Sequence, residues 1–127
     1  MKLALDHLTV TDTTPIDLVR AAEATQCESF CLFMQSLEVL PRMPEFNLIG
    51  SSAEQRDLKA AMQASSVKLD MAYPFTLGGR TNVKDFLPGL ECAAFLEAEF
   101  VNALVYDRDD ALRENNFLTF AEMAMHH

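Results

Sequence analysis

Hydrophobic residues form four short runs along the chain, and each run is followed by a segment with helical spacing. The runs cover residues 3–10, 29–34, 67–73 and 100–106, and we interpret them as strands. The run at 29–34 is apolar at nearly every position, which is typical of a strand in a parallel sheet with both faces covered. The hydrophobic pattern therefore predicts four alternating strand–helix units.

The segments between the strands carry helix-start signals. Thr14 can cap a helix whose first residue is Pro15, and Ser51 opens a capping-box pattern, Ser-Ser-Ala-Glu-Gln. Asn82 is placed to cap a third helix, in which Pro88 can shift the start or cause a kink. We expect Pro74 to end the third strand. In the last helix, four apolar residues are predicted to share one face: Phe117, Phe120, Ala121 and Ala124.

Strict alternation of strand and helix predicts an α/β fold with a mostly parallel sheet and right-handed crossovers. Two architectures fit: four β/α units forming half of a (β/α)8 TIM barrel, or an open doubly wound parallel sheet. Periodicity alone does not separate them. The 127 residues contain no linker or low-complexity segment, so residues 1–127 are expected to form a single α/β domain.

Charge and cysteine content narrow the classes of function. The net charge is −9, with ten scattered basic residues, whereas a nucleic-acid-binding protein needs clustered Lys and Arg. No apolar stretch is long enough to span a membrane, and Asp6 and His7 interrupt the first run too early for a signal peptide. Cys27, Cys31 and Cys92 form an odd set without a Cys-x-x-Cys motif. We expect reduced thiols and a cytoplasmic protein that binds neither nucleic acid nor membrane.

Four stretches of sequence resemble a known family. The stretches are LDHLTVTDTTPIDLVRAAEA, CLFMQ, KLDMAYPFTLGGR and FVNALVYDRDD, and together they extend over nearly the whole chain. They resemble the sugar-phosphate isomerase/epimerase proteins, which are xylose isomerase-like TIM barrels. The resemblance implies the N-terminal half of a barrel about twice this length, because in the family a fifth strand follows a helix like the last one here. We expect the half-barrel to be completed by the remainder of a longer chain or by forming a homodimer.

In TIM barrels the active site lies at the carboxyl ends of the strands. That rule selects His7 as a catalytic candidate, since its pKa near neutrality suits proton transfer; the alternative is a histidine bonded to a backbone carbonyl. Candidate substrate-binding residues are Gln35, Tyr73, Arg80, Tyr106 and Arg108. The two arginines could hold a phosphate, or they could be solvated loop residues. Asp6 and Asp107 are expected to lie too far apart to form a carboxylate pair.

The resemblance also implies a divalent metal ion, Mn, Mg, Zn or Co, that polarises the substrate oxygens. Its ligands would come from the fifth to eighth strands, so none is expected in this chain. The leading hypothesis is the N-terminal half of a metal-dependent sugar or sugar-phosphate isomerase/epimerase that supplies substrate-side pocket residues. The alternative is a non-catalytic half-barrel module that acts through self-association, because an uncovered aliphatic and aromatic sheet face promotes association. The nucleotide-binding motifs of doubly wound sheets are absent.

Overall fold

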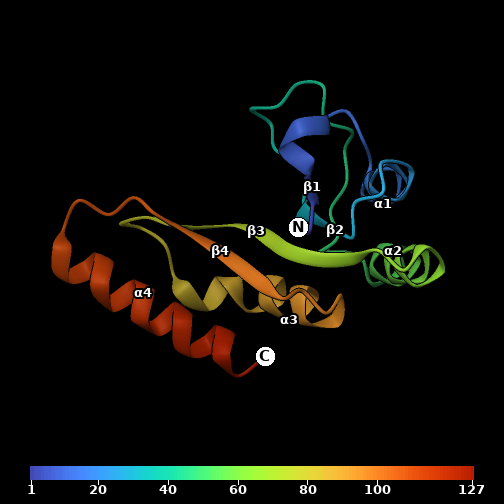
Figure 1. The fold of residues 1–127 in the computed structure, drawn as a ribbon. Helices are drawn as coiled ribbons and strands as arrows, with labels where there is room; N and C mark the ends of the chain where they lie inside the picture. The colour runs from blue at the N-terminus through green and yellow to red at the C-terminus, as the bar shows by residue number, and fades with distance from the viewer.

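A computed structural model describes residues 1–127 and contains four parallel strands in the order β1-β2-β3-β4. The strands are β1 (Ala4–Asp6), β2 (Ser29–Phe33), β3 (Lys68–Leu77) and β4 (Phe100–Val105). The helices that follow them are α1 (Pro15–Ala24), α2 (Ser52–Ser65), α3 (Leu87–Phe95) and α4 (Asp110–Met125). Two short 3-10 helices complete the fold: η1 (His7–Val10) and η2 (Val83–Phe86). The predicted alternation of strand and helix is confirmed (Figure 1).

Capping hydrogen bonds confirm the predicted caps at Thr14, Ser51 and Asn82, and Asp109, which was not predicted as a cap, starts α4 in the same way. The side chains of Thr14, Ser51, Asn82 and Asp109 each accept a bond from a backbone N–H two or three residues further along, at 2.9–3.2 Å. Each bond satisfies one of the N–H groups that the first turn of a helix leaves unpaired. Asn82 caps η2, and α3 begins only at Leu87, with Pro88 in its first turn. The shifted start that Pro88 suggested is therefore present.

The first strand is shorter than the sequence predicts. It ends at Asp6, because the Asp6 carboxylate accepts the N–H of Leu8 at 2.8 Å and turns the chain into η1. Residues 7–10 are therefore helical, and the prediction of a strand over 3–10 is wrong for this part.

The third strand is longer than predicted, because it continues through Pro74 to Leu77. The pairing of β3 with β4 shifts register between Ala72 and Phe75, so Pro74 lies at an irregularity. A proline lacks the N–H that a regular ladder uses, and such irregularities are where a sheet tolerates it. The prediction that Pro74 ends the strand is wrong for this reason.

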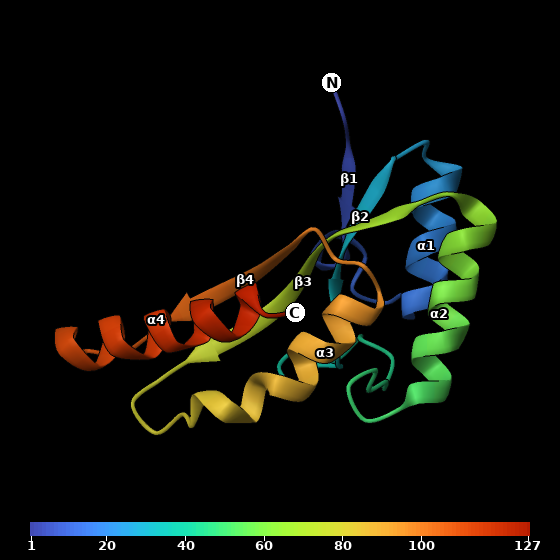
Figure 2. The ribbon, with the colours of Figure 1, turned by 90° about the horizontal axis from the view of Figure 1, so that it is seen from below.

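The helices lie on one face of the sheet. Because the strands follow one another in chain order, right-handed crossovers carry every helix to the same side. Figures 1 and 2 show α1 to α4 together on one side, which we call convex; in Figure 1 the short η1 and the loop between β2 and α2 lie beyond β1 and β2, away from α3 and α4. A core of 22 buried residues lies between the helices and the sheet, with Phe30 and Leu32 of β2 fully buried in it. The strand order does not reverse, so the four strands contain no switch point of the kind at which doubly wound sheets bind ligands.

The carboxyl ends of the strands are not level. Phe33, the last residue of β2, pairs with Tyr73, so β3 continues for four more residues to Leu77. At about 3.3 Å per residue this extension is roughly 13 Å long. β4 runs beside it to Val105, and Figure 2 shows both strands projecting away from β1 and β2. This uneven edge decides which loop residues can meet.

The buried face of α4 differs from the predicted one. Phe120 is 3% exposed and Asn116 is also buried, but Phe117 is 46% exposed. The Asn116 amide donates a hydrogen bond to the buried Asp107 carboxylate at 3.2 Å, and this contact fixes the rotation of the helix. The prediction that Phe117 shares the buried face is wrong, because the buried face includes the polar Asn116, which a hydrophobic pattern does not reveal.

Truncating Phe120 should therefore destabilise the protein strongly. We expect Phe120→Ala to lower the free energy of unfolding by about 3–5 kcal/mol, since it removes a buried ring. Leu118→Ala, at a position 54% exposed on the same helix, should cost less than about 1 kcal/mol. Urea unfolding followed by circular dichroism measures both changes. Equal losses in the two variants would contradict the assigned rotation of α4.

Candidate functional site

Four polar side chains gather on the concave face of the sheet: Asp6, Cys31, Asp70 and Tyr73. Asp6 pairs in register with Cys31, and the Tyr73 hydroxyl donates a hydrogen bond to Asp6 Oδ1 across β2. The Cys31 thiol lies 4.0 Å from Asp70 Oδ2. The expectation of an aliphatic and aromatic uncovered face therefore holds only in part for β1–β3, because Asp6 and Asp70 are charged whereas Tyr73 is aromatic. On β4 the apolar Leu104 is 37% exposed.

The contact between Asp6 and Tyr73 lies at the carboxyl end of β1. Asp6 Oδ1 accepts both the Tyr73 hydroxyl and the Leu8 N–H, whereas Asp6 Oδ2 has no hydrogen-bond partner in the protein. Burial raises the pKa of the Tyr73 hydroxyl, and the hydrogen bond to Asp6 raises it further. At neutral pH Tyr73 is therefore a hydrogen-bond donor, and the second oxygen of Asp6 is free to accept from a ligand.

Aromatic rings lie behind this pair. The Phe33 ring centroid is 4.4 Å from that of Tyr73, and the His7 ring is 5.6 Å from Phe33. Phe46, from the long loop after β2, stacks on the other side of His7 at 5.7 Å. The polar pair is thus supported by a packed aromatic layer, which holds the end of β3 and the turn after β1 in fixed positions.

His7 is fully buried, and both of its ring nitrogens are bonded to the backbone. Nδ1 accepts the Phe33 N–H at 3.3 Å, and Nε2 lies 3.0 Å from the Thr13 carbonyl, to which it donates in the tautomer that these contacts require. Burial lowers the pKa of His7, and the opposing effects of the Thr13 bond and the nearby Asp6 charge are smaller. The geometry matches the alternative of a backbone-bonded histidine and leaves no ring nitrogen for a substrate.

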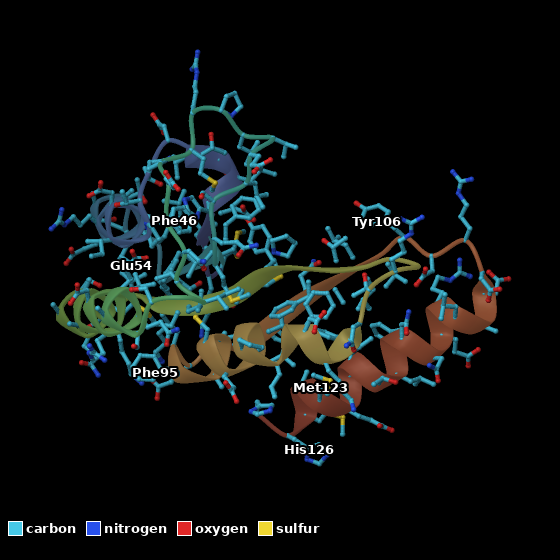
Figure 3. The ribbon with its side chains drawn as sticks, turned by 180° about the vertical axis from the view of Figure 1, so that it is seen from behind. Phe46, Glu54, Phe95, Tyr106, Met123 and His126 are labelled. Carbon is cyan, nitrogen blue, oxygen red and sulfur yellow. The ribbon has the colours of Figure 1, made fainter.

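The other sequence-selected residues lie apart from this cluster. Gln35 is exposed just after β2, where its backbone forms an isolated antiparallel β-bridge with Asn47. Arg80, Tyr106 and Arg108 are exposed at the projecting end of β3 and β4, and neither arginine forms an ion pair. Figure 3 shows Tyr106 well separated from Phe46, which stacks on His7. Of the predicted substrate-binding residues, only Tyr73 lies in the cluster.

The partners of Tyr73 were not predicted from the sequence. Asp6 and Asp107 have different partners in the structure: Tyr73 for Asp6 and Asn116 for Asp107. Alternation along β1 and β2 could have placed Asp6 and Cys31 on one face. Their meeting with Tyr73 depends on the register between β2 and β3, which includes a shift between Phe30 and Cys31.

No group of three or more His, Cys, Asp or Glu side chains comes together as a possible metal site. The largest hollow, about 540 Å³, lies at the opposite, amino end of the sheet, between the ends of α2 and α3. None of the helices is long and apolar enough to cross a membrane. Comparison with protein-family models gives no match, and comparison with curated proteins gives none either.

Burial of neutral His7 should make stability depend on pH. The unfolded chain binds a proton at His7 near pH 6.5, and the folded protein binds it only at lower pH. The free energy of unfolding should therefore be constant above this pH and fall as the pH drops through it, by up to about 1.4 kcal/mol per pH unit. His7→Gln should lose this slope, whereas His126→Gln, at an exposed position, should keep it. Urea unfolding between pH 5 and 8 measures the slope, and an unchanged slope in His7→Gln would contradict this account.

Only one of the three thiols should react readily in the folded protein. Burial raises the pKa of Cys31 and Cys92 to about 11, and both side chains are buried. Cys27 is only half-buried. Because the thiolate is the reactive form, we expect iodoacetamide at pH 8 to modify Cys27 first and the other two only after unfolding. Peptide mass spectrometry identifies the modified residue; rapid labelling of Cys31 would show that the concave face is more open than described.

Proposed function

We propose that the chain is the substrate-side half of an α/β barrel of the sugar isomerase/epimerase type, and that Asp6 and Tyr73 bind the hydroxyl groups of a polyhydroxy compound. One observation carries the proposal: a hydrogen-bonded carboxylate and phenol lie at the carboxyl end of β1, on the sheet face opposite α1 to α4. In β/α barrels this end of the sheet is where ligands bind.

The chemistry of the pair suits a hydroxylated ligand. Asp6 Oδ2 is free to accept hydrogen bonds from hydroxyl groups, and bonds to a charged oxygen are stronger than bonds between neutral groups. The Tyr73 hydroxyl can donate to or accept from a neighbouring hydroxyl. Its aromatic ring, packed on Phe33, offers an apolar surface to the C–H groups of a sugar.

The charge around the pair favours an unphosphorylated sugar over a sugar phosphate. Asp6 and Asp70 both lie on the concave face, so a phosphate group placed there would be repelled. Arg80 and Arg108 follow the projecting ends of β3 and β4, beyond an extension of roughly 13 Å from Tyr73. A phosphate held by these arginines would belong to a ligand site other than the Asp6–Tyr73 pair.

Enzymes of this type use a divalent metal ion, and the residues of this chain do not form a site for one. We therefore assign this chain no metal-dependent step. Its residues bind and orient the ligand. His7 is assigned a positioning role, because it ties η1 to the end of β2 through Thr13 and Phe33 and so fixes the adjacent Asp6.

A non-catalytic module that acts through self-association is a second candidate. It is favoured by the apolar side chains exposed along β4 and α4, among them Leu104 and Phe117.

Sugar binding tests the first candidate. We expect D-xylose and D-fructose to bind weakly to the wild-type chain, with isothermal titration calorimetry as the measurement. Asp6→Asn should weaken binding about tenfold, because it removes the charge but keeps an oxygen that can cap η1. Tyr73→Phe should weaken binding by a similar factor, since it removes only the hydroxyl. A phosphorylated fructose should bind more weakly than fructose.

Tyr106→Phe is the matched control, because Tyr106 is 68% exposed at the far end of β4 and outside the proposed site. It should leave sugar binding unchanged. Equal affinity in the wild type, Asp6→Asn and Tyr73→Phe would refute the assignment of these residues, and so would a stronger effect of Tyr106→Phe.

A further inference from the structure

Both edges of the sheet are open. The Tyr106 N–H bonds to the Leu77 carbonyl of β3 at 2.9 Å. Because N–H groups alternate in direction along a strand, those of Ala103 and Val105, which follow the register shift, point away from β3, toward the free edge of β4. β1 has the same exposure on its outer side, since its only partner is β2. An unpaired edge of this kind is a template for another strand.

A groove runs beside the free edge of β4. It has a volume of about 400 Å³, and Val105 and Phe117 form its apolar part, while charged residues of α4 form its rim. At the opposite edge of the sheet, Leu3, the residue before β1, is 58% exposed, and alternation with Leu5, which packs against the core, places it on the helix-facing side. At the β4 edge, the apolar side chain of Phe117 therefore has no strand beside it. At the β1 edge, the apolar side chain of Leu3 has no helix over it.

We propose that a second copy of this chain occupies these edges, with β4 of each copy beside β1 of the other, so that two copies close an eight-stranded barrel. Four parallel strands with all helices on one face provide half of such a barrel, and eight strands are enough to close one. The arrangement has two-fold symmetry and two identical seams, where a seam is the contact of β4 of one copy with β1 of the other. No edge stays open, so growth stops at the dimer. Phe117 of each copy would cover Leu3 of the other.

Charge at the seam favours this pairing over contact between other surfaces. Lys2 lies just before β1 and Glu99 just before β4, and both are exposed. Parallel pairing of β4 with β1 of the second copy places Lys2 of one copy near Glu99 of the other, at both seams. Each chain carries a net charge of −9, so contact between arbitrary surfaces is opposed by repulsion, whereas this contact brings opposite charges together.

The dimer does not depend on the proposed sugar site, because the edges and the groove are present whether or not Asp6 and Tyr73 bind a ligand. Closure would place two concave faces opposite each other. Asp6 and Tyr73 of each copy would then lie in an enclosed space that both copies line.

Sedimentation velocity at tens of micromolar protein tests the proposal. The wild type should sediment as a species of twice the 14.2 kDa chain mass. Phe117→Lys should give a monomer with an unchanged circular dichroism spectrum, and Val39→Lys, which places the same charge at a loop position 81% exposed, should remain dimeric.

A charge exchange identifies the seam itself. Lys2→Glu and Glu99→Lys, each alone, should weaken dimerisation on the order of tenfold, because each places like charges at both seams. An equal mixture of the two variants should recover dimerisation as a heterodimer, since both of its seams again pair opposite charges. Native mass spectrometry distinguishes the heterodimer when one variant carries a heavy isotope.

Three results would overturn the proposal: a wild-type monomer at these concentrations, open chains that lengthen with concentration, or a dimer that neither Phe117→Lys nor the charge exchange affects. None of these results bears on sugar binding by Asp6 and Tyr73, which calorimetry measures separately.

Discussion

The handedness of the strand–helix–strand crossover is the constraint on which the rest of the structure depends. Because the four strands follow one another in chain order, that handedness places every helix on one face of the sheet. One face then becomes the core, the concave face is left without any of the four α-helices, and the edges at β1 and β4 stay open (Figure 1). The proposed ligand site and the proposed contact with a second copy both use surfaces that remain uncovered because all four α-helices lie on one face.

The candidate site results from the uneven ends of the strands. β1 and β2 end near Tyr73, whereas β3 and β4 continue beyond it to Leu77 and Val105. Asp6 and Tyr73 therefore meet on the concave face, and the loops with Arg80 and Arg108 project away from them. His7 holds the turn after Asp6 against the end of β2 through two backbone contacts. Burial of its ring in a neutral form is part of the fold's stability, in contrast to the proton-transfer role that its strand-end position suggested.

Local features of the fold could be predicted from the sequence, and long-range features could not. The caps at Thr14, Ser51 and Asn82 and the order of elements are encoded within a few neighbouring residues, and they are confirmed. The register that pairs Phe33 with Tyr73, the irregularity that accommodates Pro74 and the bond between Asn116 and Asp107 join distant segments. No pattern within a single segment specifies them. The strand-end rule selected Tyr73 but not Asp6, because the contact between these two residues is set by strand register.

The central claim is that a polyhydroxy ligand binds at Asp6 and Tyr73. Mapping the backbone amide resonances that respond to D-xylose tests this claim most directly, because the molecule offers two distinct places for a ligand. The account predicts that the shifted resonances cluster around Asp6, Leu8 and Tyr73 at the carboxyl end of the sheet. The largest hollow, of about 540 Å³, lies instead at the amino end and is lined by Lys59, Ser66 and Glu97, among others. Shifts confined to that hollow would contradict the assignment of the concave carboxyl end as the ligand site.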